Sequence, residues 1–138
     1  MGCWRAAWQV IQQRLPTKGL LCLRTALETD DSALLQGAST NPPPWDCVSD
    51  WSLSGGCPIV YAGWRAGLFS TVGEGEIYFA QLASRLDREL GWPSACFTFL
   101  NFWDDGRREE VRALLLEEVT QEIQNRLPSY LRSLNAHA

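Results

Sequence analysis

The segment "SACFTFLNFWDD", residues 94–105, decides between a helical and a mixed fold. Its phenylalanines and threonine suit a β-strand, which would make the chain an α+β protein. Its polar residues, however, recur at steps of three or four and not of two: Thr98, Asn101, Asp104 and Asp105. That spacing is typical of a mostly buried helix with one narrow polar edge. We therefore predict a helix here and, with it, an all-α fold.

The sequence on both sides has helical spacing as well. After residue 105 we expect a long helix over 107–127, capped by Asp104 or Asp105 and broken by Pro128. Its inward residues would be Val111, Leu114, Leu115, Val119, Ile123 and Leu127. Before residue 94 we predict helices over 4–15, 18–27 and 70–90, and a short capped helix in "TDDSALLQG", residues 29–37.

The segment "CPIVYAGWRAGLF", residues 57–69, leaves the fold class open at one point. Ile59 and Val60 favour a strand, whereas Pro58 suits the first turn of a helix. The prediction is a single compact helical domain over residues 1–138, with about five to six helices. The alternative is an α+β fold with short strands near 57–63 and 95–103.

Residues 38–56 should form one long internal loop rich in proline and tryptophan. Consecutive prolines at 42–44 favour an extended turn, and we expect indole rings to pin this loop to the core. The core of a chain of this length should not hold all of its seven tryptophans, so we expect one or two to remain at the surface. The candidate partner-binding residues are these indoles and the neighbouring loop acids: Trp45, Asp46, Asp50, Trp51 and Trp92.

Charge and cysteine content exclude several classes of protein. A net charge of −4 and a pI near 4.9 argue against nucleic-acid binding. Apolar runs are too short for a membrane span. The five cysteines are odd in number and have no C-x-x-C spacing, which favours reduced thiols in the cytoplasm over disulfides or zinc. The basic, acid-free first 27 residues allow an organellar targeting segment, and hence stroma or matrix, as the alternative location.

Catalytic and metal sites have little support in the sequence. The single histidine, His137, is the penultimate residue, where a fixed partner and shelter are rare. The acids Asp104 and Asp105 are better explained as helix caps than as Mg²⁺ ligands or an acid–base pair. Cys47 follows Asp46, which does not help it ionise. We therefore expect no catalytic residue, metal or cofactor.

These observations favour a non-catalytic intracellular accessory or assembly protein that acts through contacts with another protein. Homodimer formation is a further option for its partner. The alternative function is a small hydrophobic-ligand binder, or a carboxylate- or thiol-based enzyme, centred on residues 45–57. We find no known family whose motifs run through the chain.

Overall fold

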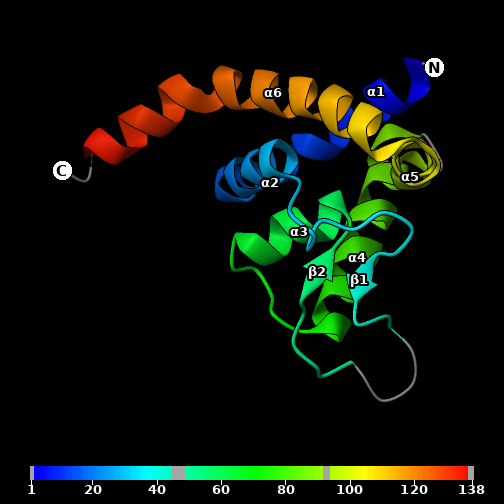
Figure 1. Ribbon diagram of the computed structural model, residues 1–138. Helices are drawn as coiled ribbons and strands as arrows, with labels where there is room; N and C mark the ends of the chain where they lie inside the picture. Colours follow the sequence, from blue (N-terminus) through cyan, green and yellow to red (C-terminus); the bar gives the residue numbers. More distant parts are fainter. Residues whose placement is uncertain (1, 45–48, 92–93, 137–138) are drawn as a thin grey trace.

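The protein is mostly helical, as the spacing of its apolar residues predicts. The computed structural model describes residues 2–44, 49–91 and 94–136 (Figure 1). Within these residues its elements are, in chain order, α1 (Gly2–Gln12), α2 (Thr17–Thr29), β1 (Thr40–Asn41), β2 (Gly55–Gly56), α3 (Pro58–Arg65), α4 (Val72–Leu90), α5 (Ala95–Asp105) and α6 (Arg108–Ala136). The all-α prediction is confirmed, and the α+β alternative is wrong.

The deciding segment forms α5, which packs against α1. Phe99 and Trp103 are fully buried, and the Phe99 ring lies 4.6 Å from the Trp8 ring. One turn away on each helix, Trp4 stacks on Phe102 with 3.8 Å between ring centroids. Aromatic pairs of this kind add to the stability that comes from area burial alone. The phenylalanines that suggested a strand therefore join two helices.

The segment 57–69, whose residues favoured both helix and strand, contains helix α3. Pro58 occupies the first turn, where a missing N–H costs nothing because helix-start N–H groups have no partner within the helix. Ile59, Val60 and Ala62 are fully buried, so the β-branched residues serve the core and not a sheet. Helix α3 packs against α2 at Gly19, whose lack of a side chain lets the two backbones approach closely.

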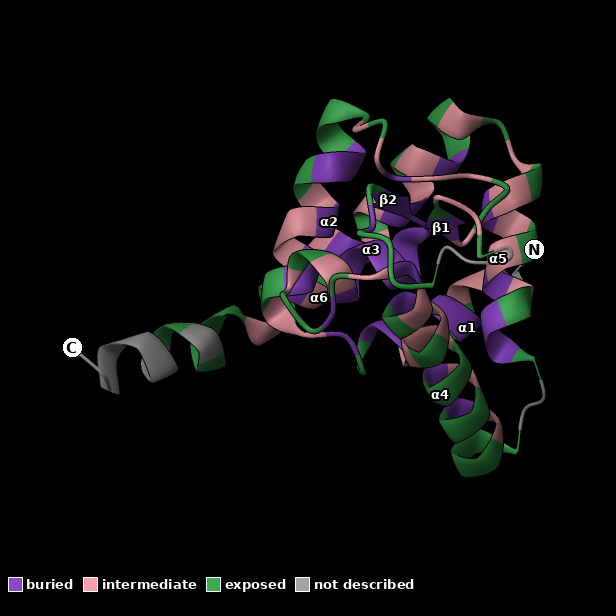
Figure 2. Ribbon diagram, turned by 90° about the horizontal axis from the view of Figure 1, so that it is seen from below, coloured by how far each residue is buried: buried purple, intermediate pink, exposed green. Residues whose placement is uncertain are grey.

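Helix α6 is longer than its sequence suggests. Its buried stripe consists of Val111, Leu115, Val119 and Ile123 at steps of four. Pro128 does not end the helix, contrary to the prediction, since its turn lies outside the core and a carbonyl freed there can bind water. Leu127 is likewise exposed, not inward. The last turns extend away from the rest of the molecule in both views (Figures 1 and 2).

The predicted helix over residues 29–37 is absent. Asp31 forms a local turn instead, in which its carboxylate accepts a hydrogen bond from Ala33 N at 2.9 Å. Leu34 then forms an isolated parallel β-bridge with Gly56, and the Arg108 guanidinium donates a hydrogen bond to the Leu34 carbonyl at 2.8 Å. Asp104 also differs from its predicted role, because it accepts from Gly37 N at 2.8 Å and does not cap α6.

The 38–56 connection is a long loop held by two very short strands. Strand β1 pairs antiparallel with β2, with Thr40 opposite Gly56 and Asn41 opposite Gly55. The bond between Asn41 and Pro42 is cis. We predicted that indole rings would pin this loop to the core, and for Trp51 this prediction is wrong, because its side chain is 57% exposed. The same exposure confirms the prediction that at least one tryptophan remains at the surface.

Across the described residues, no helix has the length and apolar content needed to cross a membrane.

Candidate functional site

The start of α4 is fixed by a reciprocal capping arrangement. Thr71 Oγ1 accepts from the Glu74 backbone N–H at 3.3 Å, and Glu74 Oε1 accepts from the Thr71 backbone N–H at 3.2 Å. The hydrogen bond from the Thr71 side chain holds the pKa of Glu74 below its ordinary value. Such a capping box sets where a helix begins and the direction from which the chain enters it.

The end of the long loop lies over this first turn of α4. Gly73 N donates to the Ser49 carbonyl at 2.7 Å, and Val72 N donates to the Trp51 carbonyl at 2.9 Å. A side chain at Gly73 would place its Cβ 2.9 Å from the Ser49 oxygen, so the close approach depends on glycine. The backbone of Trp51 is therefore held in place while its indole ring stays mostly in water.

A small hollow lies beside this contact. It has a volume of about 310 Å³ and is lined by Pro44, Ser49, Val72, Gly73 and Glu76. Ser39 Oγ donates to Glu76 Oε1 at 2.7 Å, which holds the carboxylate at the edge of the hollow. One turn beyond Gly73, Ile77 is 59% exposed. Ile77 and Trp51 are thus both exposed, and the Trp51 backbone contacts the first turn of the helix that carries Ile77, which makes this end of α4 a candidate binding surface.

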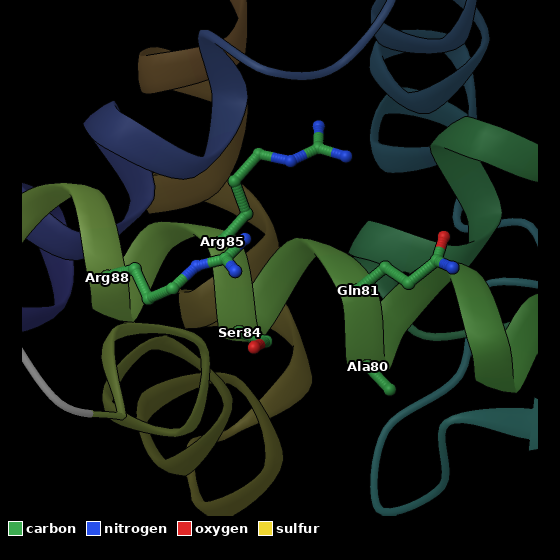
Figure 3. A pocket seen from close by; sticks show the side chains of 5 residues that line it. All are labelled: Ala80, Gln81, Ser84, Arg85 and Arg88. Carbon is green, nitrogen blue, oxygen red and sulfur yellow. The ribbon is translucent and has the colours of Figure 1, made fainter.

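The same outward face of α4 ends in two arginines. A second hollow of about 420 Å³ is lined by Ala80, Gln81, Ser84, Arg85 and Arg88 (Figure 3). Figure 3 shows Gln81 and Arg85 leaning to one side of the helix, and Ala80 and Ser84 to the other. We call the whole strip, from Trp51 through Ile77 to Arg88, the α4 surface. It is apolar at the helix start and cationic towards the helix end.

The structure brings together part of the predicted partner-binding set. Trp51 and Asp50 are both exposed next to the start of α4. Trp45, Asp46 and Trp92 lie outside the described residues, as do Cys47 and His137.

Sequence reasoning missed Ile77, Arg85 and Arg88. Ile77 lies outside the apolar stripe that Tyr78, Leu82, Leu86 and Leu90 form at steps of four, and this position is the signal that the sequence offers. Arg85 has an acid, Glu89, four residues on, so the sequence suggests an ordinary ion pair within the helix. Glu89 instead pairs with Arg14 of the α1–α2 connection.

A second cluster carries titratable groups but is engaged in the fold. Tyr61 Oη donates to Asp31 Oδ2 at 3.0 Å, beside a hollow of about 360 Å³ that Cys22 and Arg65 also line. Burial, together with the hydrogen bond to Asp31, raises the pKa of Tyr61 to about 12. The phenol is therefore protonated at neutral pH and holds α3 against the loop that follows α2. The guanidinium of Arg65 lies 5.1 Å from the Trp64 ring centroid.

Two of the described groups that a thiol- or carboxylate-based enzyme could use, Cys57 and Asp104, are engaged in the fold. Burial raises the pKa of the Cys57 thiol to about 12, and Cys57 has 1% of its surface exposed. Burial also raises the pKa of Asp104, whose carboxylate already accepts from Gly37. Among the described side chains there is no cluster of three or more acids, cysteines or histidines arranged to hold a metal.

We expect the buried thiols to resist alkylation in the folded protein. In mildly alkaline buffer iodoacetamide should modify the exposed Cys3. Cys57 and Cys96 should react only after unfolding, because burial raises the pKa of each thiol to about 12. Peptide mass spectrometry with and without denaturing urea measures this difference. Equal labelling of Cys3 and Cys57 in the folded state would contradict the burial of Cys57.

The same pKa values define a pH dependence. The folded state keeps the thiol protons that the unfolded state loses above the ordinary pKa of 9.0. The free energy of unfolding should therefore fall as the pH rises from 9.0 towards 12.

No protein-family model, no curated protein and no solved structure matches this chain.

Proposed function

We propose that this chain is a non-catalytic intracellular accessory or assembly protein that binds another protein through the α4 surface. The observation that carries this proposal is the exposure of Trp51 on a rigidly held backbone. Exposed tryptophans are rare, and they are prominent among the residues that dominate binding energy in protein interfaces. A backbone fixed by hydrogen bonds to Val72 and Gly73 reduces the entropy that such an anchor loses on binding.

The geometry of the α4 surface supports docking better than catalysis. Its apolar groups, Trp51 and Ile77, are exposed towards the start of α4, and its two arginines lie towards the end of the helix. Aromatic residues and arginine are both enriched in protein interfaces. The described thiols and carboxylates with raised pKa values lie elsewhere, in the core or under the loop.

The test is capture of a partner from native lysate by the wild type and by Trp51→Ala. Loss of a central tryptophan anchor is expected to weaken binding by about 2 kcal/mol or more, roughly 30-fold. The matched control is Leu127→Ala, which removes an exposed apolar side chain from the far end of α6. A partner retained by the wild type and Leu127→Ala but lost by Trp51→Ala is the expected result.

Site-specific cross-linking identifies the bound protein and its contact. A benzophenone amino acid at position 51 should form an adduct with the captured protein, or with a second copy of the chain if the protein is a homodimer. The proposal fails if Trp51→Ala and the wild type capture the same proteins with equal yield and position 51 forms no adduct.

A further inference from the structure

Two arginines at the cationic end of the α4 surface have no acidic partner among the described residues. Seven arginines form ion pairs within the described residues: Arg5, Arg14, Arg24, Arg107, Arg108, Arg112 and Arg126. Arg85 and Arg88 are exposed, and none of the described carboxylates lies within ion-pair distance of either. In a chain with 16 acids and 12 bases, acidic partners are not scarce. Arg85 and Arg88 nevertheless remain without one and share one face of α4.

The nearby acids are engaged elsewhere. Glu89, four residues after Arg85, pairs with Arg14. Asp87, next to Arg88, accepts a hydrogen bond from Ser94 N at 3.0 Å. Both arginines line the 420 Å³ hollow, whose other walls are the short or neutral side chains of Ala80, Gln81 and Ser84. The hollow thus offers cationic donors beside room for an incoming chain.

The spacing of these arginines fits carboxylates on a helix. Residues three apart on a helix have side chains about 5–6 Å apart, and acids three or four apart on a second helix have the same separation. Each guanidinium can donate two parallel hydrogen bonds to one carboxylate. Ile77 lies 11 residues before Arg88, which is about 16 Å along the helix axis and an apolar contact for the same segment.

We propose that the α4 surface recognises an acidic helical segment of the partner, with a pair of carboxylates against Arg85 and Arg88 and an apolar side chain near Ile77. This inference rests on the proposed docking function and specifies the chemistry of the partner. A nucleic acid is the other polyanion to consider, but the chain carries a net charge of −4, which opposes phosphate backbones. A protein segment with only a few acids meets less of that repulsion than a phosphate backbone does, because it carries fewer negative charges.

The test uses two fluorescein-labelled synthetic helical peptides and the full chain. The first peptide carries one leucine and, about 16 Å along its helix, two glutamates three residues apart; the second has glutamine in place of both glutamates. Fluorescence anisotropy should show that the glutamate peptide binds at least about tenfold more tightly, with a preference that weakens as salt is added. Arg85→Gln/Arg88→Gln should abolish the preference.

Arg65→Gln is the matched control, because Arg65 is also an exposed arginine without an ion pair in the described residues, on α3 and outside the α4 surface. It should keep the preference. Circular dichroism should show every variant folded, since the substituted side chains are all exposed.

Each remaining outcome decides against the inference. Absence of glutamate-peptide binding, equal binding of the two peptides, an unchanged preference in Arg85→Gln/Arg88→Gln, or tighter binding of a labelled DNA duplex would overturn it. Failure of the docking function itself is recognised separately, by a Trp51→Ala variant that captures the same proteins as the wild type. The two failures are therefore distinguishable.

Discussion

Gly19→Ala will destabilise the protein by about 3 kcal/mol, although alanine is the better helix former by about 1 kcal/mol. An alanine Cβ at this position of α2 would lie 2.2 Å from the Ala62 carbonyl oxygen and 2.8 Å from its carbon. Both atoms belong to the backbone of α3, so no rotation of a side chain relieves the clash. The Ala62 oxygen also accepts from Ala66 N at the end of α3, which holds it in place.

Gly75→Ala is the matched control for this prediction. Gly75 is also buried within a helix, but a Cβ there would make contacts of 3.4 Å with side chains only. We expect it to be neutral or to raise the free energy of unfolding by up to about 1 kcal/mol. Urea denaturation of both variants measures the two effects. Equal stabilities for Gly19→Ala and the wild type would show that α2 and α3 do not pack this closely.

A helix can be predicted from the sequence wherever one of its faces is buried, because the buried apolar residues then recur at helical spacing. Residues 95–105 are helical because Phe99 and Trp103, four residues apart, fill the core against α1. The polar residues of this helix, which recur at steps of three or four, lie along its opposite edge. The start of α4 was equally readable, because a capping box is a local arrangement of Thr71 and Glu74. Both signals lie within a few residues of the structure that they specify.

The errors occurred where distant residues decide the local structure. Asp31 and Leu34 looked like parts of a short helix, but the bridge to Gly56 and the hydrogen bond from Arg108 hold this segment in an open turn. Pro128 is typical of a helix end, yet it lies in an exposed turn of α6 and the helix continues past it. Gly56 and Arg108 are both far from residues 29–37 in the sequence, so the local spacing of apolar residues cannot indicate their contacts with this segment.

In the candidate site, too, local features could be predicted from the sequence and features that depend on tertiary contacts could not. An exposed tryptophan is expected from the number of tryptophans in a short chain, and Trp51 is one of the predicted partner-binding indoles. The arginine pair could not be found in this way, because Glu89 stands four residues after Arg85, where an ion-pair partner within a helix is expected. Only the tertiary contact between Arg14 and Glu89 leaves Arg85 without one.

Trp103→Ala should lower the free energy of unfolding by about 3–5 kcal/mol, the range for removing a fully buried large aromatic side chain. Trp103 also ties the core to the loop that precedes β1, because its Nε1–H donates to the Leu35 carbonyl at 2.7 Å. Gln36 Nε2 donates in return to the Trp103 carbonyl at 2.7 Å. Trp103→Phe keeps most of the ring volume but leaves the Leu35 carbonyl unpaired, so it should cost about 1–3 kcal/mol.

Trp51→Ala provides the contrast that separates the two roles of tryptophan in this chain. Its indole is 57% exposed, and its hydrogen bond to Val72 uses only the backbone carbonyl, so the stability should change by no more than about 0.5 kcal/mol. Chemical denaturation of all three variants measures these differences under one set of conditions. Comparable losses for Trp51→Ala and Trp103→Ala would mean that the Trp51 ring belongs to the core, and the docking role would lose its anchor. A stable Trp51→Ala variant that no longer captures its partner would instead show that this ring serves binding and not folding.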